Sequence, residues 1–245
     1  MRAFGRLHHL FAAVTGTFAV LVATLAISPA QAAGTGAISG TVTATGSAGL
    51  PGVNVRLYAI SGSGWSPTGM SVQTATDGSY LLNGLAEGRY RVCFHDAAGT
   101  YLDECWNNKP SVWQGEDIGV TGGAITPDKD AVMAPGARIS GVVADAKGAP
   151  LANVSISIGR ATSQPGIWDF VQGAVTDQFG AYDVRGLRAG TYRVCFRDAG
   201  NTYVDECWND RPTMDEAEDI VLAEGAHALS KDAVLDVEAR ISGDV

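Results

Sequence analysis

Short runs of β-branched and aromatic residues alternate along this chain with turns rich in Gly, Pro, Asn and Asp, at a spacing of about 8 to 12 residues. This spacing, without segments of helical period, predicts an all-β fold of the sandwich or barrel type. The clearest predicted strands of the first half are residues 38–43, 53–60, 79–82, 89–94 and 101–106, and each has a counterpart in the second half.

The sequence repeats itself at a shift of 102 residues. Tyr90-Arg91-Val92-Cys93-Phe94 recurs as Tyr192-Arg193-Val194-Cys195-Phe196, and Glu104-Cys105-Trp106-Asn107 recurs as Glu206-Cys207-Trp208-Asn209. The repeat predicts two tandem β-sandwich domains, residues 33–136 and 137–238. A further Ile-Ser-Gly near the end makes residues 239–245 either the start of a third repeat or a C-terminal strand that completes the second domain.

The first 32 residues predict a secretory signal peptide. Arg2 and Arg6 form a basic start, an uncharged apolar run follows over residues 10–27, and Ala30-Gln31-Ala32 is a small-residue cleavage site. An uncleaved anchor is the alternative, because an apolar run of this length can nearly span a bilayer. The cleavage site and the helix-breaking Pro29 favour a secreted, extracellular chain with no membrane contact after cleavage.

The charge balance is acidic, with 17 basic and 26 acidic residues and a formal net charge of −9. Loss of Arg2 and Arg6 with the signal peptide makes the net charge −11. Because nucleic acids and anionic membranes attract basic surfaces, we expect neither of them to be a partner of this acidic chain.

Four cysteines form two pairs with the same spacing, Cys93 with Cys105 and Cys195 with Cys207. An even count behind a signal peptide indicates disulfides, and four cysteines allow three pairings. The repeat favours pairing within each domain. Folding residues 93–105 about Gly99 into a hairpin places Cys93 opposite Cys105, so we expect a structural bond.

Each repeat also carries the same series of short motifs. They are Ile-Ser-Gly, Gly49-Leu50-Pro51 before Asn54-Val55 and Gly148-Ala149-Pro150 before Asn153-Val154, Gly78-x-Tyr80 and Gly180-x-Tyr182, and then Gly-Leu-x-x-Gly-x-Tyr-Arg-Val. This series resembles the carboxypeptidase regulatory-like domain. The Cys-x₁₁-Cys-Trp-Asn extension is similar to a version found in tandem arrays on secreted actinobacterial proteins.

The resemblance implies an Ig-like or transthyretin-like sandwich that is grouped with carbohydrate-binding-like folds. It also implies a non-catalytic accessory module, adhesive or structural, that binds a cell-surface protein or serves as a spacer. The alternative is a module that binds a starch-like polysaccharide within a secreted glycoside hydrolase system of the alpha-amylase type. Since a fold does not supply a ligand, the choice rests on individual residues.

The residues do not assemble a recognisable catalytic or metal site, so we expect no enzyme activity, no metal and no cofactor. A zinc peptidase needs two histidines and a glutamate, yet only His95 and His227 follow the signal peptide, one in each repeat. Asp103 and Glu104 are neighbours on a predicted strand, so their side chains point to opposite faces and cannot share a substrate. We expect both to be solvent-facing or turn-capping acids.

Trp65 and Trp168 are the candidate ligand contacts. Both lie in variable connections flanked by Gly, Ser and Pro, and a tryptophan in a loop can stack on a sugar or anchor a protein. The alternative is that each caps its own core. Trp106 and Trp208, beside the cysteines, are expected to pack on the disulfides, and Trp113 has no counterpart in the second repeat.

Overall fold

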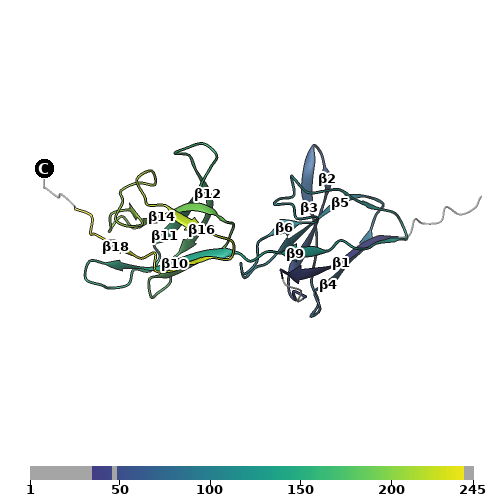
Figure 1. Cartoon of the computed structure of the whole chain (residues 1–245), viewed down its shortest axis with the longest axis horizontal. Coiled ribbons are helices and arrows are strands. Elements are labelled where there is room, and N and C mark those ends of the chain that lie inside the picture. Colours follow the sequence, from purple (N-terminus) through teal and green to yellow (C-terminus); the bar gives the residue numbers. More distant parts are fainter. Residues whose placement is uncertain (1–34, 46–48, 240–245) are drawn as a thin grey trace, which may run out of the picture. The chain divides into compact units, whose positions relative to one another are not determined.

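The computed structural model describes residues 35–45 and 49–239 (Figure 1). The predicted signal peptide, residues 1–32, lies outside the described residues, as do residues 240–245 of the predicted C-terminal extension. The described part of the chain is built from strands and turns without a helix. The predicted all-β fold is therefore confirmed.

Nine strands form the first repeat and nine form the second. The first nine are β1 (Gly36–Ala44), β2 (Asn54–Ser61), β3 (Gly64–Gln73), β4 (Ser79–Leu85), β5 (Gly88–His95), β6 (Glu104–Cys105), β7 (Ile118–Val120), β8 (Ile125–Thr126) and β9 (Ala131–Met133). The second nine are β10 (Ala137–Asp145), β11 (Ser155–Ala161), β12 (Trp168–Val175), β13 (Ala181–Leu187), β14 (Gly190–Arg197), β15 (Glu206–Cys207), β16 (Ile220–Leu222), β17 (His227–Ala228) and β18 (Ala233–Leu235).

Each repeat contains two sheets with the same strand order. In the first repeat one sheet runs β3-β2-β5-β6, with β7 also on β5, and the other runs β4-β1-β8, with β9 also on β1. The second repeat gives β12-β11-β14-β15 with β16, and β13-β10-β17 with β18. The ladders are antiparallel except where β8, β9, β17 and β18 pair in parallel with the first strand of their repeat.

A separate hydrophobic core fills the space between the two sheets of each repeat. In the first repeat the core includes Ile38 of β1, Leu57 of β2, Leu82 of β4 and Phe94 of β5, all at most 2 % exposed. Tyr80 meets Phe94 edge-to-face with 5.8 Å between ring centroids, a favoured aromatic geometry. Tyr182 and Phe196 make the same contact in the second repeat.

The connections predicted around the two candidate tryptophans are strands. Trp65 lies on β3 and Trp168 begins β12, and each of these strands is paired antiparallel with the strand before it. The glycines and the proline near Trp65 indicate a loop, but β2 supplies the hydrogen-bonding partner that holds the segment extended. The prediction that the two tryptophans lie in loops is therefore wrong.

The predicted strand over residues 101–106 is shorter than expected. Only Glu104 and Cys105 pair with β5, while Tyr101 forms an isolated bridge with Pro135. The carboxylate of Asp96 accepts hydrogen bonds from the backbone N–H groups of Thr100 and Tyr101, at 2.7 and 2.9 Å. This side-chain turn replaces part of the expected ladder.

The two Asn-Val motifs do not occupy equivalent positions. Asn153 has a φ of 63° and donates its backbone N–H to the carbonyl of Thr176. In the first repeat Gly52, with a φ of 77°, donates in the same way to Thr74, and Asn54 is already part of β2. Since Gly and Asn both tolerate this left-handed conformation, the turn is retained although the sequence motifs are offset.

Candidate functional site

The disulfides join neighbouring strands on one sheet of each repeat. Cys93 of β5 lies opposite Cys105 of β6, and Cys195 of β14 lies opposite Cys207 of β15. Both bonds are present, each with 3.8 Å between the Cα atoms. Each bond therefore fixes a two-residue strand to a long one.

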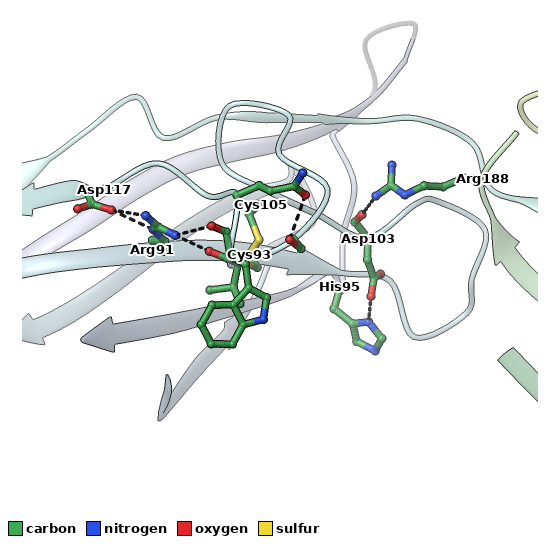
Figure 2. The surroundings of a disulfide bond; sticks show 11 residues. Arg91, Cys93, His95, Asp103, Cys105, Asp117 and Arg188 are labelled. Atoms are coloured by element: carbon green, nitrogen blue, oxygen red, sulfur yellow. Dashed lines mark hydrogen bonds and ion pairs between the residues drawn. A yellow bond between two sulfur atoms is a disulfide. The ribbon is translucent and has the colours of Figure 1, made fainter. Parts of the chain in front are cut away.

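A partly buried arginine lies near each disulfide and binds the loop that follows it. Figure 2 shows Arg91 two residues before Cys93, with its guanidinium directed at Asp117. The Nε atom donates to the Asp117 carboxylate at 2.9 Å, and Nη1 donates to the carbonyl oxygens of Val112 and Trp113 at 2.6 and 3.2 Å. One side chain therefore joins Val112, Trp113 and Asp117 of the loop between β6 and β7 to β5.

The same guanidinium covers one face of the candidate tryptophan. The Cζ atom of Arg91 lies 4.2 Å from the ring centroid of Trp65, and Arg193 lies 4.2 Å from that of Trp168. Such a cation–π contact is worth about 1–2 kcal/mol when it is partly desolvated. Both indoles are partly buried, and the Nε1 atom of Trp168 is buried without a hydrogen-bond partner among the described residues. Their role as ligand contacts stays a prediction.

The surroundings of the two tryptophans differ in one respect. In the second repeat an open pocket of about 560 Å³ is lined by Trp168, Arg193, Asp215 and Asp219, among others. In the first repeat Trp113 replaces Asp215, and its ring packs against the backbone of Gly64, next to Trp65. Trp113 is 69 % exposed, so the tryptophan that was the weakest candidate for a ligand contact is the most accessible of the three.

Trp106 and Trp208 each contact a lysine. Both indoles pack partly buried against the core of their repeat, and the Nζ atoms of Lys129 and Lys231 lie 4.5 and 4.0 Å from the ring centroids. The sequence analysis missed these cation–π contacts. Equivalent lysines before each Asp-Ala pair were the signal that could have found them.

The acid pair of each repeat divides into one exposed and one inward-facing carboxylate. The Asp103 carboxylate accepts from the backbone N–H of Asp96 at 3.1 Å and lies 2.5 Å from Nδ1 of His95, as expected for a turn-capping acid. Glu104 is only 6 % exposed, so the prediction of a solvent-facing or turn-capping side chain is wrong for this residue. Alternation along β6 turns Glu104 to the opposite side from Asp103, and that side is covered by protein.

Burial raises the pKa of the Glu104 carboxyl to about 7, and the positive charge of Arg188 partly offsets this rise. Arg188 also donates to the backbone carbonyl of Asp103 at 2.5 Å (Figure 2). The pKa of Glu206 is raised to about 7 as well, by burial first and then by the charges of Asp210 and Asp236, against a backbone hydrogen bond from Val234 that lowers it. Both repeats therefore contain a carboxyl group that titrates near neutral pH.

His95 and its counterpart Arg197 both place a nitrogen beside an aspartate. Arg197 Nε lies 3.5 Å from Asp205, as His95 Nδ1 lies beside Asp103. Within residues 35–45 and 49–239, His, Cys, Asp and Glu side chains do not come together in a group of three or more that could hold a metal ion. The expectation of no metal therefore stays a prediction. In the same part of the chain, a helix long and apolar enough to cross a membrane is not found.

Residues 138–205 match the family model of the carboxypeptidase regulatory-like domain. This segment covers nearly all of β10 and continues through β14, so the resemblance stated from the motifs is confirmed for the second repeat. No curated protein matches the chain.

Several solved bacterial structures are similar to the chain at low identity. A streptococcal ancillary pilin is 13 % identical over 86 % of this chain and 64 % of the pilin, with a TM-score of 0.41. The Bacillus anthracis TIE protein is 17 % identical over 83 % of this chain and 34 % of its own, with a TM-score of 0.34. The shaft pilin SpaA from Lactobacillus rhamnosus GG is 11 % identical over 85 % of this chain and 100 % of its own, with a TM-score of 0.38. The chain spans less than two thirds of the first two proteins, and no residue role transfers from any of them.

Proposed function

Because residues 138–205 carry a carboxypeptidase regulatory-like domain and the first repeat has the same strand order, we propose that this chain is a non-catalytic extracellular module with a structural or adhesive role. The proposal concerns the whole chain. It assigns the two repeats the same role, in which each is a folded β-sandwich domain of an extracellular structural or adhesive protein.

One observation carries this proposal. The cysteines and the arginine–tryptophan pairs are engaged inside their own repeat, and the second repeat duplicates these contacts. The cysteines are oxidised, and Arg91 binds Asp117 and Trp65 as Arg193 binds Asp219 and Trp168. A set of contacts kept in both copies supports a role in stability.

Export from the cell is part of the proposal. Two disulfides in a chain of this size are typical of oxidising compartments, and the first 32 residues have the pattern of a signal peptide. Expression of the full chain in a secreting host, followed by N-terminal sequencing of protein from the medium, should give a chain that begins at Ala33. Retention of an intact N-terminus in the membrane fraction would contradict it.

The role of the tryptophans separates a structural module from a binding module. We would measure retention of the purified, oxidised chain on insoluble starch, cellulose, chitin and peptidoglycan, together with thermal unfolding. A structural role predicts no retention, and it predicts that Trp65→Ala and Trp168→Ala each lower the free energy of unfolding by about 1–3 kcal/mol. Trp113→Ala, which removes an exposed ring, is the matched control and should leave the unfolding temperature nearly unchanged.

Polysaccharide binding is the second candidate function, and the pocket beside Trp168 favours it. Its volume of about 560 Å³ is in the usual range for ligand sites, and it combines an aromatic ring with Arg193, Asp215 and Asp219. This function predicts retention on one of the four polymers that Trp168→Ala abolishes while the chain stays folded. Retention that is unchanged in Trp168→Ala would reject the pocket as the site.

A further inference from the structure

A β-bulge interrupts β4 near its end, where the strand pairs with β1 (Figure 1). The register between the two strands shifts after Leu82, and Asn83 and Gly84 therefore lie together opposite Ala37. Gly84 adopts a φ of 76°, in the left-handed region that glycine occupies without strain. Because a bulge leaves an extra residue unpaired, the backbone at Asn83-Gly84 is held less firmly than in a regular ladder.

Both residues of this pair are open to solvent. Asn83 and Gly84 are exposed, although Leu82 and Leu85 on either side of them are buried. A Cβ atom added to Gly84 would meet no atom within 4 Å apart from its chain neighbours. Within the described part of the chain the Asn83 side chain forms no hydrogen bond, so its amide is able to rotate. Water and the next backbone nitrogen can therefore both reach this amide.

We propose that Asn83 is a site of spontaneous deamidation. The backbone nitrogen of Gly84 attacks Cγ of Asn83, and the new N–Cγ bond closes a succinimide ring. The Cγ–Nδ2 bond breaks, and the side-chain nitrogen leaves as ammonia with the proton that the Gly84 nitrogen gives up. Water then opens the ring at either of its carbonyl carbons and leaves aspartate or isoaspartate at position 83. Both products are ionised at neutral pH, so the surface of the first repeat gains a negative charge.

The residue after an asparagine controls ring closure. A side chain on the attacking residue crowds the approach of its backbone nitrogen to Cγ, and glycine has no side chain. Asn83 is the only asparagine in the sequence that precedes a glycine. The others are Asn54, Asn107, Asn108, Asn153, Asn201 and Asn209, and each precedes a residue with a side chain. We therefore expect Asn83 to react first.

The turn at Asp77-Gly78 could close the same ring, but its structure protects it. The Asp77 carboxylate accepts hydrogen bonds from the backbone N–H and the hydroxyl of Ser79, at 3.0 and 2.7 Å. These hydrogen bonds hold the pKa of Asp77 below its usual range, and an ionised carboxylate resists attack by a nitrogen. Gly78 also packs against the backbone of Val42. Two pairs that are similar in sequence therefore differ in reactivity.

The second repeat keeps the bulge without the reactive amide. Arg185 and Gly186 take the places of Asn83 and Gly84 in β13, and Gly186 has a φ of 72°. An arginine has no amide group to lose. The modification is therefore expected in the first repeat alone.

Mass spectrometry of the purified, oxidised chain during incubation in warm, mildly alkaline buffer tests the proposal. Base accelerates ring closure because it removes the proton of the attacking N–H. We expect Asn83 to convert at least about tenfold faster than any other asparagine of the chain, with aspartate and isoaspartate both present among the fragments. Isoelectric focusing should show an acidic form that migrates with the variant Asn83→Asp.

Two variants test the ring closure itself. Gly84→Asp keeps a residue type that tolerates the left-handed conformation but adds a side chain to the attacking residue. Asn83→Gln keeps an amide but would require a larger ring. Each variant should form the acidic species at least about tenfold more slowly than wild type, and circular dichroism checks that each one is folded.

A comparison of the folded with the unfolded chain tests whether the fold leaves the pair open. Since the bulge lies at an exposed strand end, the rate at Asn83 in the folded chain should be within about tenfold of the rate in guanidinium chloride. A larger slowing would mean that pairing with β1 protects Asn83, and it would overturn the proposal. Conversion at Asn83 that is no faster than at the other asparagines, or that is unchanged in Gly84→Asp, would overturn it as well.

Discussion

In the first repeat the edge strand β3 carries Pro67 and a glycine in a left-handed conformation, whereas the second repeat exposes Phe170, Val171 and Val175 on β12. Behind these edges the two repeats are the same in their disulfide and their arginine–tryptophan contact. The shared contacts join different segments of one repeat, whereas the residues that differ here lie on an edge strand and are exposed. The disulfide and the arginine–tryptophan contact therefore belong to the fold that both repeats share, and the edge strand is where the two repeats differ.

The largest expected effect is the loss of a disulfide. Replacing Cys93 and Cys105 by Ser, or Cys195 and Cys207 by Ser, should lower the free energy of unfolding of the affected repeat by about 3 kcal/mol, because a loop of this size is no longer closed in the unfolded chain. Urea unfolding of both double variants measures the effect. We expect the two double variants to lose similar amounts of unfolding free energy. A loss in only one of them would show that the two hairpins have the same geometry but do not contribute equally to stability.

The next effect comes from the partly buried arginines, Arg91 and Arg193. Arg91→Met and Arg193→Met remove a carboxylate pair, two carbonyl contacts and a cation–π contact while keeping an apolar stem. We expect a loss of about 2 kcal/mol in each case. Thermal unfolding would measure it, with Arg89→Met, whose side chain is exposed, as the control. An unchanged unfolding temperature in either variant would contradict the assigned structural role.

The two inward-facing glutamates, buried Glu104 and partly buried Glu206, give a smaller effect that depends on pH. Their pKa of about 7 lies above that of an unfolded chain, so the folded state binds the proton more tightly. Their contribution to stability is complete below about pH 4, the unfolded pKa, and is lost as the pH rises through about 7. Glu104→Gln should therefore be more stable than wild type at about pH 8.5, by about 1 kcal/mol, and Glu206→Gln should gain less, because solvent screens the more exposed Glu206.

Neighbouring charges sharpen this comparison. Arg188 lowers the pKa of Glu104, whereas Asp210 and Asp236 raise that of Glu206. Arg188→Gln should therefore steepen the loss of stability between about pH 5 and about pH 8.5 in a chain with intact Glu104, but not in the Glu104→Gln background. Equal slopes in the two backgrounds would show that the arginine acts through its hydrogen bond to Asp103 and not through its charge.

The smallest effect is expected at the exposed position where the repeats differ. Trp113→Asp and Asp215→Trp exchange the two residues, and each should change the free energy of unfolding by less than about 0.5 kcal/mol, as exposed positions usually do. Unfolding in urea measures the change. A loss above about 1 kcal/mol for Trp113→Asp would mean that the ring is part of the packing behind Gly64.

Much of the fold could be predicted from local sequence. The alternation of apolar residues located most of β1, β2, β4 and β5, because a half-buried strand must repeat with a period of two. The repeat at a shift of 102 residues and the glycine midway between Cys93 and Cys105 indicated the disulfide pairing. The strand pattern and the turn glycine lie within a few residues of the feature that they predict, and the repeat is found by comparing the sequence with itself.

The edge strands could not be predicted in this way. The segment 62–69 contains Gly62, Gly64, Pro67 and Gly69, which locally favour turns, and it is extended because β2 provides a ladder for it. For the same reason the two tryptophans were assigned to loops, although an arginine 26 residues after Trp65 covers its ring. The local sequence pattern does not show which distant strand pairs with a segment or which distant side chain covers a ring.

The sequence by itself determined the strand pattern, the tandem repeat and the pairs of cysteines. Backbone period and turn residues are properties of neighbouring positions, and a repeat is visible wherever the sequence is compared with itself. Only the tertiary structure decided that Glu104 is buried, that Trp113 is exposed, and that Phe170 on the edge strand β12 is exposed. Burial and exposure depend on which distant segments pack over a side chain. Two adjacent residues such as Asp103 and Glu104 can therefore have the same chemistry in the sequence and opposite environments in the fold.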